Sequence, residues 1–339
     1  MKFHFKKPKS LSMRKTFVLL ATGALLFAIG CTKSAKNEPL ATSQEDETST
    51  PVTQRQCASN DVLEEQLKAD PGLVQRMNQI EEFTKQVEAN PLQYRLVNGV
   101  FEIPVVFNVL YKTAAQNVSQ AQLQSQIDVL NEDYAATNAD YNLTSTYNSV
   151  KSGNIGVRFV LDQVKRRSTT TTSWSTNDAM KKSAKGIAPT SPTTKLNIWV
   201  CNMGGGILGY AQFPGGASAT DGVVLDDNAT GRVGTAAAPF NKGRTATHEV
   251  GHWLNLRHIW GDATCGNDQV GDTPLHNTAN YGCPAAGHKS TCTGTPVEMT
   301  MNYMDYTDDA CMYMFSAGQK TRMLAVFASG GPRNSFAQP

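Results

Sequence analysis

The residues with the clearest chemistry lie between His248 and His258. His248 and His252 stand four positions apart, so on a helix their imidazoles share one face and can bind one metal ion. Glu249 lies beside them, where its carboxylate can accept a proton from a water on that ion. His258 can complete the set only if the helix stops and the chain reverses near Asn255, a residue type that tolerates the left-handed backbone.

Three neutral imidazoles leave the fourth tetrahedral position of a zinc ion open, as in catalytic rather than structural zinc sites. A water there loses a proton near neutral pH, and Glu249 can take that proton and pass it to a leaving amine. Histidines that are merely hydrogen-bonded in a core are the alternative, but chance produces this pattern with a probability on the order of 10⁻⁴. The pattern therefore predicts zinc-dependent hydrolysis.

Regular elements must position these side chains. Alternating or short apolar runs predict strands at 101–111, 155–161, 196–200, 204–213 and 223–225. Apolar residues at helical spacing predict helices from just after Ser119 to about 134, at about 242–255 and near 317–328. This order of elements is typical of an α+β domain with a mixed sheet.

The N-terminus predicts export. Six of the 31 basic residues lie in the first fifteen positions and precede an uncharged apolar run at 16–30. The run is short for a membrane span and typical of a secretory signal, with a short membrane anchor as the alternative. The segment 28–31 is similar to a bacterial lipobox, so Cys31 either carries a lipid or ends a signal that is simply cleaved. The rest of the 339-residue chain is slightly acidic, which argues against a nucleic-acid surface.

Two segments separate the signal from the main domain. Residues 32–56 hold almost no large apolar side chains and are predicted to be a flexible tether. Apolar residues at helical spacing within 61–87, interrupted at Pro71, predict a short helical propeptide. We therefore expect a signal at 1–31, a tether and propeptide at 32–98, and a catalytic domain at 99–339.

Three motifs carry a resemblance to a known family: the run from His248 to His258, the segment from Asn302 to Tyr306, and the segment from Cys311 to Phe315. Together they resemble the metzincin zinc proteases, and more narrowly the pappalysin family, over about 101–327. Asn255 stands where most metzincins have Gly. The resemblance implies peptide hydrolysis by a zincin fold in which a cleft separates two parts. These are an upper part at about 99–258, with a twisted mixed sheet and a long active-site helix, and an irregular, disulfide-stabilised lower part at about 259–339.

The resemblance also implies roles for residues near the histidines. Met304 is expected to pack beneath the metal, and Tyr306 to help hold the oxyanion. The Gly-rich strand is expected to form the cleft edge against which an extended peptide pairs, with the substrate-binding residues Gly206, Leu208 and Gly209. A β-hairpin bend is the alternative reading of that strand. Peptides and unfolded protein segments are the expected substrates.

The seven cysteines suit an exported protein. Four of them lie in the irregular region, where disulfides would stiffen a loop-rich fold. The sequence allows three pairings, and the resemblance implies Cys265 with Cys292 and Cys283 with Cys311. A structural zinc site formed by Cys283, His288 and Cys292 is the alternative.

Cys57 is expected to keep the enzyme latent. The segment 55–58 resembles the cysteine switch of metzincin propeptides, in which a thiolate occupies the open zinc position. Such a ligand would exclude the water that hydrolysis needs. An ordinary thiol in a tail is the alternative.

Acidic residues after the third histidine suggest a calcium site. Asp262, Asp268 and Asp272, with Thr273 nearby, lie in a Gly-rich loop, and oxygen ligands in a flexible loop suit Ca²⁺. The resemblance implies structural calcium in this region. Solvated loop acids are the alternative.

Asp308 and Asp309 are candidates for substrate specificity. In metzincins the chain after the Met304 turn walls the pocket for the residue that follows the scissile bond. A carboxylate in that pocket would bind an arginine side chain bidentately, so we expect cleavage before Arg, as the preference of pappalysins for basic residues also implies. Solvated or calcium-binding acids are the alternative.

The sequence as a whole predicts a zinc metalloendopeptidase that is made as a latent zymogen. It is expected to be secreted or anchored by a lipid at an outer membrane or cell surface. A surface binding or adhesion lipoprotein that keeps the fold without turnover is the alternative, but such a protein has no need of Glu249. A zinc carrier would have long His-rich or acidic tracts, which this chain lacks. The physiological substrate, the maturation site and the oligomeric state are not predicted.

Overall fold

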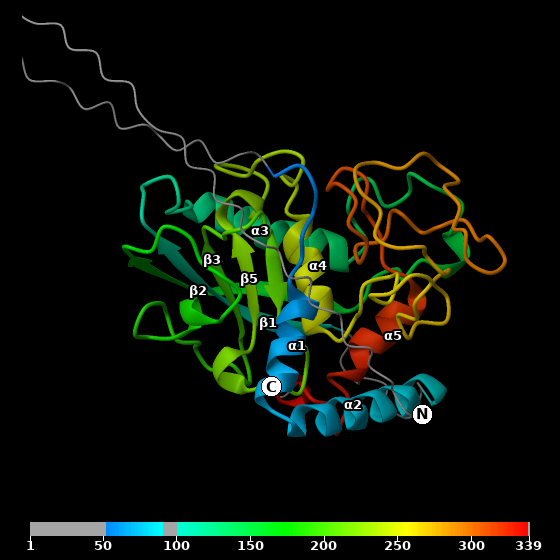
Figure 1. The fold of residues 1–339 in the computed structure, drawn as a ribbon, viewed down its shortest axis with the longest axis horizontal. Helices are drawn as coiled ribbons and strands as arrows, with labels where there is room; N and C mark the ends of the chain where they lie inside the picture. The colour runs from blue at the N-terminus through cyan, green and yellow to red at the C-terminus, as the bar shows by residue number, and fades with distance from the viewer. Residues whose placement is uncertain (1–51, 91–99, 338–339) are drawn as a thin grey trace, which may run out of the picture. The chain divides into compact units, whose positions relative to one another are not determined.

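The computed structural model describes residues 52–90 and 100–337 (Figure 1). The predicted signal with Cys31, most of the predicted tether and the segment 91–99 lie outside the described residues. None of the helices in the described part combines the length and the apolar character that a bilayer span requires.

A five-stranded sheet forms the centre of the upper part. Its strands are β1 (Phe101–Tyr111), β2 (Val157–Ser168), β3 (Leu196–Cys201), β4 (Gly209–Ala211) and β5 (Val223–Asp226). They lie in the order β2-β1-β3-β5-β4, and all neighbours are parallel except β4 and β5, which are antiparallel. The predicted α+β class with a mixed sheet is confirmed.

Helices α3 (Gln120–Tyr134) and α4 (Arg244–Trp253) pack against one face of this sheet. Ile103 of β1, Leu123 of α3 and Val250 of α4 belong to one buried cluster, which explains the alternating and helical apolar patterns of the sequence. Helix α3 begins where predicted, because the Ser119 hydroxyl accepts a hydrogen bond from the N–H of Gln122 at 3.1 Å.

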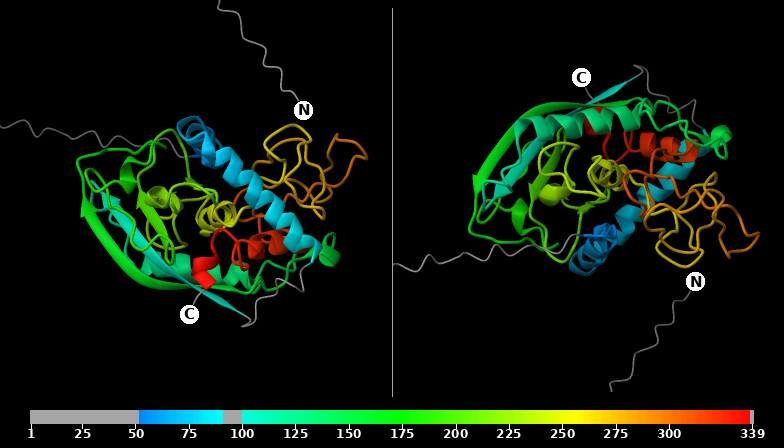
Figure 2. Two further views of the ribbon diagram at one scale, coloured as in Figure 1. Left: turned by 90° about the horizontal axis from the view of Figure 1, so that it is seen from below. Right: turned by 90° about the horizontal axis from the view of Figure 1, so that it is seen from above.

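The N-terminal segment folds onto the sheet and the C-terminal helix. Its helices are α1 (Ser59–Ala69) and α2 (Gly72–Ala89), and the break between them lies at Pro71, as predicted. Ala58 and Val62 join Trp199 in a buried cluster on the second face of the sheet. Helix α2 packs beside α5 (Ala317–Ala325), as both views in Figure 2 show. The prediction that the flexible tether continues to residue 56 is wrong at that end, because Arg55 is only 1% exposed.

Two strands differ in length from the prediction. Strand β4 has only three residues, because Gly205 and Gly206 take left-handed φ angles of 72° and 76° and turn the chain before the strand begins. Strand β2 continues to Ser168, beyond the predicted end at 161. The prediction stopped there because the second half of the strand is polar and lacks the alternating apolar residues that indicate a strand. Helix α5 also ends earlier than predicted, at Ala325.

The lower part is mostly irregular, as predicted, and α5 is its α-helix within the described residues. Disulfides join Cys265 to Cys292 and Cys283 to Cys311, the pairing that the family resemblance implies. A zinc site that uses Cys283 and Cys292 is therefore excluded. Short 3₁₀ helices complete the described chain: η1 (Asn148–Val150), η2 (Ala179–Lys181), η3 (Ser218–Thr220), η4 (Asp227–Ala229) and η5 (Asn334–Ala337).

Candidate active site

Helix α4 carries the first half of the site. His248, Glu249 and His252 lie on it and are all buried. The helix ends at a sharp reversal in which Asn255 has a φ of 73°, the left-handed conformation that the sequence predicts there. This reversal brings His258 back to the other two histidines.

The three histidines converge on one point. The Nε2 atom of His252 lies 3.2 Å from that of His248 and 3.1 Å from that of His258. On the far side of each ring, Nδ1 lies within hydrogen-bonding distance of an oxygen atom: Tyr303 O, Leu256 O and Asp262 Oδ1. With protons on Nδ1, the Nε2 lone pairs face one another, an arrangement that suits a shared cation. Three such imidazoles fit zinc.

A fourth donor comes from the N-terminal segment. One donor atom from Cys57 and one from each histidine lie within 4.8 Å of one another. Burial, and then the charge of Glu249, raise the pKa of the Cys57 thiol well above its usual value. A thiolate at this position therefore depends on a cation among the four donors.

The Glu249 carboxylate is also held by the N-terminal segment. The Ser59 hydroxyl donates a hydrogen bond to its Oε2 at 2.9 Å, and the Sγ atom of Cys57 lies 3.3 Å from the same oxygen. Burial raises the pKa of Glu249 to about 7, although these two contacts lower it. Burial also lowers the pKa of His252 to about 3, which keeps this imidazole neutral, as a metal ligand must be. A carboxyl group with a pKa near 7 can both accept and release protons at neutral pH.

Tyr306 and Met304 reach the site from the lower part. The Tyr306 hydroxyl donates a hydrogen bond to the backbone carbonyl of Cys57 at 3.0 Å, so it already holds a peptide oxygen. Met304 is fully buried, and a Cβ atom at Gly251 would lie 2.5 Å from its Sδ atom. Gly251 is thus required for this packing. The sequence did not predict this role, although the place of Gly251 between His248 and His252 was a signal.

The cleft-edge strand β4 pairs with the N-terminal segment. Leu208 donates its N–H to the carbonyl of Gln56 at 2.9 Å, and Ala58 donates to the carbonyl of Gly209 at 3.0 Å. A Cβ atom at Gly209 would lie 2.8 Å from a backbone oxygen of β5, so glycine permits the close packing. Gly206 lies in the turn before β4. Of the three residues predicted to bind substrate along this strand, Leu208 and Gly209 therefore stand on the paired edge.

A buried pocket next to α4 holds the side chain of Arg55. Its guanidinium donates hydrogen bonds to three oxygen atoms: Asp309 Oδ1 at 2.6 Å, Thr245 Oγ1 at 3.1 Å and Thr307 O at 3.3 Å. The guanidinium also lies 5.0 Å from the centre of the Phe240 ring. Because Arg55 and Asp309 are both fully buried, the pocket is built to accept a planar cation.

The Asp309 carboxylate is fixed by the start of α4. Its Oδ2 atom accepts backbone hydrogen bonds from Lys242 at 2.7 Å and Arg244 at 3.2 Å. Asp308, the other acid predicted for this pocket, is partly exposed and lies outside this set of bonds. The sequence did not predict that Arg55 occupies this pocket. The place of Arg55 two residues before Cys57 was the one signal available.

The acids that were predicted to bind calcium have separate partners. Asp262 lies 2.5 Å from Nδ1 of His258, and Asp272 accepts hydrogen bonds at the start of α5. Asp268 is buried and accepts a hydrogen bond from the Thr273 hydroxyl at 2.9 Å. Burial raises the pKa of Asp268 to about 6. The structure brings Asp268 and Thr273 together, whereas the other two acids support neighbouring elements.

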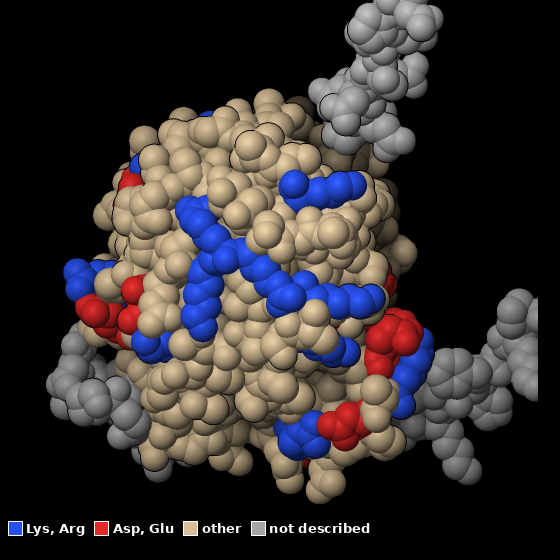
Figure 3. All heavy atoms as spheres, turned by 90° about the vertical axis from the view of Figure 1, so that its left-hand side faces the viewer, with Lys and Arg blue, Asp and Glu red and all other residues tan. Residues whose placement is uncertain are grey.

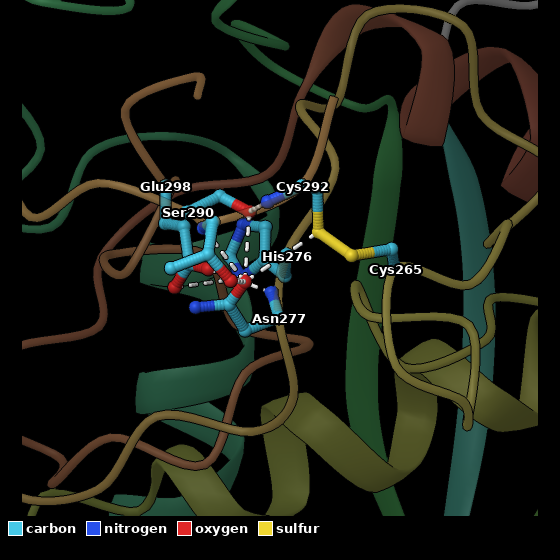
Figure 4. The surroundings of a disulfide bond; sticks show 7 residues. Cys265, His276, Asn277, Ser290, Cys292 and Glu298 are labelled. Atoms are coloured by element: carbon cyan, nitrogen blue, oxygen red, sulfur yellow. Dashed lines mark hydrogen bonds and ion pairs between the residues drawn. A yellow bond between two sulfur atoms is a disulfide. The ribbon is translucent and has the colours of Figure 1, made fainter. Parts of the chain in front are cut away.

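A buried polar network supports the segment that carries Tyr306. Figure 4 shows His276 and Glu298 of this network beside a disulfide. The Asn280 side chain donates hydrogen bonds to Glu298 at 2.7 Å and to Asp305 at 3.0 Å. Asp305 in turn accepts the backbone N–H of Tyr306 at 2.8 Å. The network therefore positions the tyrosine through its backbone.

Comparison with known proteins places this geometry in a family. The family model described as Pregnancy-associated plasma protein-A matches residues 194–328. Extracellular metalloprotease 1 of Coccidioides posadasii is 32% identical over 239 residues, which are 67% of this chain and 76% of the relative. An extracellular metalloprotease of Pyricularia oryzae is 36% identical over 222 residues, 63% of this chain and 70% of the relative.

Two solved structures are similar in fold and sequence. Mature mirolysin from Tannerella forsythia, in complex with a cleaved peptide, is 43% identical with a TM-score of 0.68, covering 71% of this chain and 96% of that one. A promirolysin mutant from the same organism is 41% identical with a TM-score of 0.75, covering 83% of this chain and 97% of that one.

Proposed function

Because the chain belongs to the pappalysin family of metalloproteases, we propose that it is a zinc metalloendopeptidase that is exported and made as a latent precursor. The observation that carries the proposal is the convergence of three histidine Nε2 atoms beside the buried carboxylate of Glu249. The extracellular relatives support export. A lipid on Cys31 and a calcium ion at Asp268 in the loop 262–273 are further proposals, which metal analysis and mass spectrometry of the purified protein can test.

The residues of the site divide the work of hydrolysis. Zinc held by the three histidines would supply the Lewis acid that activates a water and polarises the scissile carbonyl. Glu249 takes a proton from the attacking water and delivers it to the departing amine. The Tyr306 hydroxyl donates a hydrogen bond to the carbonyl oxygen as negative charge builds up there. The backbone groups of Leu208 and Gly209 bind the extended substrate.

Latency rests on three side chains of the N-terminal segment. Cys57 takes the fourth donor position, Ser59 occupies the Glu249 carboxylate, and Arg55 fills the pocket at Asp309. The larger share of this chain that promirolysin covers, 83% against 71% for the mature enzyme, supports a propeptide in this segment. Removal of the segment would free the metal position, the base and the pocket together.

The Arg55 contacts also support a preference for arginine after the scissile bond. The pocket offers one fully buried carboxylate, a hydroxyl and a carbonyl, all within 3.3 Å of the guanidinium nitrogens. A lysine ammonium has no planar fork with which to meet these acceptors, so arginine should be favoured over lysine. Asp309, rather than Asp308, determines this preference.

A peptide library tests the activity. The matured protein should cleave peptides, lose cleavage when a chelator removes zinc, and regain it when zinc is restored. A fully metal-loaded, matured protein that leaves every peptide intact would favour the binding or adhesion alternative.

The same library tests the specificity. Wild-type products should carry Arg after the cleaved bond, and Asp309→Asn should lower kcat/KM for such peptides about 10- to 100-fold, since a hydrogen bond to a charged group contributes about 1.5–3 kcal/mol. Asp308→Asn is the matched control and should keep the preference. An aliphatic preference in the wild type, or an arginine preference that survives Asp309→Asn, would overturn the assignment.

A further inference from the structure

The sheet has a second edge that the proposed function does not use. Strand β2 lies at the end of the sheet opposite β4. Around its C-terminal half lie six cations, which we name the β2 basic surface: Lys112, Lys165, Arg166, Arg167, Lys182 and Lys185. All are exposed except Lys165, which is half-buried. Figure 3 shows the face on the left of Figure 1, with Lys and Arg side chains gathered across its centre.

The charge of this region is unusual for the molecule. Residues 100–337 contain equal numbers of basic and acidic residues, yet the stretch 163–220 contains seven Lys and Arg and a single acid, Asp178. The acids near β2 are already paired with other cations, Glu102 with Arg158 and Asp162 with Lys195. The positive charge of the β2 basic surface is therefore concentrated on one face.

The hydrogen bonds that these six cations donate all go to uncharged oxygen atoms. Lys112 donates to the Thr172 hydroxyl, and Arg166 donates to the Asn117 side chain. Arg167 donates to backbone carbonyls in the loop 183–186. Within the described residues, none of the six forms an ion pair with a carboxylate. These contacts hold the side chains in place and leave their charges uncompensated.

A groove of about 520 Å³ lies in the same surface. It is lined by Arg167, Lys185, Ala184 and the hydroxyl-bearing residues 168–171. Cations and hydroxyl groups in one groove can bind the charged substituents of a sugar chain and hydrogen-bond to its hydroxyl groups.

We propose that the β2 basic surface binds a polyanionic glycan, a sugar chain that carries sulfate, phosphate or carboxylate groups. The lack of apolar anchors argues against a membrane or a single-stranded nucleic acid, which recruit apolar or stacking aromatic side chains. Among the described residues, the exposed large apolar side chains all lie elsewhere: Val74, Val100, Leu143, Val233, Leu275 and Tyr281.

Protection of an edge strand against unwanted pairing would explain cations on β2 itself. It would not explain Lys182 and Lys185, which lie off the strand, or the groove beside them. Because β2 and β4 lie at opposite ends of the sheet, a bound glycan would leave the cleft open. The surface would then hold the protein on an anionic matrix independently of its peptidase activity.

The proposal is tested by titrating the purified protein with dextran sulfate at several salt concentrations. Uncharged dextran is the blank. Dextran sulfate should bind and uncharged dextran should not. Binding should weaken as salt rises, because each contact between a cation and a sulfate releases counterions. The double substitution Lys182→Ala and Lys185→Ala should reduce the slope of log Kd against log salt by about two. Peptide hydrolysis should not change, since both side chains are exposed and neither is bonded to a residue of the proposed active site.

The control is Lys289→Ala with Lys320→Ala, which removes the same charge from the lower part. It should leave the slope close to that of the wild type. Three results would overturn the proposal: no binding of dextran sulfate, equal slopes for the two double variants, or tighter binding to phosphatidylglycerol vesicles or to an oligonucleotide than to dextran sulfate.

Discussion

Helix α4 and the segment from Asn302 to Asp309 supply the two halves of one site by different means. Every residue of α4 is buried, so packing of a regular helix sets the positions of its two proposed metal ligands. The lower segment lacks regular structure, and side-chain hydrogen bonds and disulfides hold it. Replacing Glu249 on α4 should therefore remove chemistry and leave the fold, whereas substitutions below should disturb the fold first and the chemistry through it.

The sharpest test of the α4 half is Glu249→Ala. We expect peptide hydrolysis to fall by about 10²- to 10⁴-fold, because general acid–base catalysis by one residue commonly contributes that much. Bound zinc should stay near one per chain and the melting temperature should change little, because the three ligands are spared. Loss of zinc together with activity would show that Glu249 supports the metal rather than the proton transfers.

The lower half should respond in the opposite way when its first disulfide is removed. The paired substitution Cys265→Ala and Cys292→Ala opens a loop of 27 residues and should cost about 2–4 kcal/mol in urea unfolding, with activity falling in step. Cys201→Ala, which alters a buried free thiol of the upper part, is the control and should cost less. Equal losses for the two variants would remove the distinction between the two parts.

The contact between the halves can be tested at Gly251. An added methyl group would meet the Met304 sulfur, so Gly251→Ala should destabilise the protein by about 1–3 kcal/mol and lower zinc affinity. Adding Met304→Ala should restore part of both losses, because the smaller side chain makes room. A double variant that is no better than Gly251→Ala would place the strain elsewhere in the helix.

The two halves also differ in how far sequence predicts them. The proposed ligands, the proposed base and the turn at Asn255 follow from spacing within a few residues, because helix geometry converts that spacing into position. The partner of Asp309 lies 254 positions away at Arg55, and no local pattern marks that arginine as buried. The same limit applies to calcium, since the sequence places the candidate acids in one loop but cannot show that Asp262 binds a histidine.

The smallest expected effect concerns the polar network below the site. Burial raises the pKa of Asp305 to about 7, so between about pH 4 and 7 the folded protein keeps a proton that the unfolded chain releases. This group therefore makes the protein less stable as pH rises through that range. Asp305→Asn cannot ionise and keeps an acceptor for the Tyr306 N–H, so its free energy of unfolding should rise relative to that of the wild type by about 1.4 kcal/mol between pH 6 and 8. Melting curves at both pH values measure the gain, with Asp128→Asn on α3 as the control. A constant difference between Asp305→Asn and the wild type would mean that Asp305 stays ionised in the fold, and the lower half would then depend on a buried charge rather than on a shared proton.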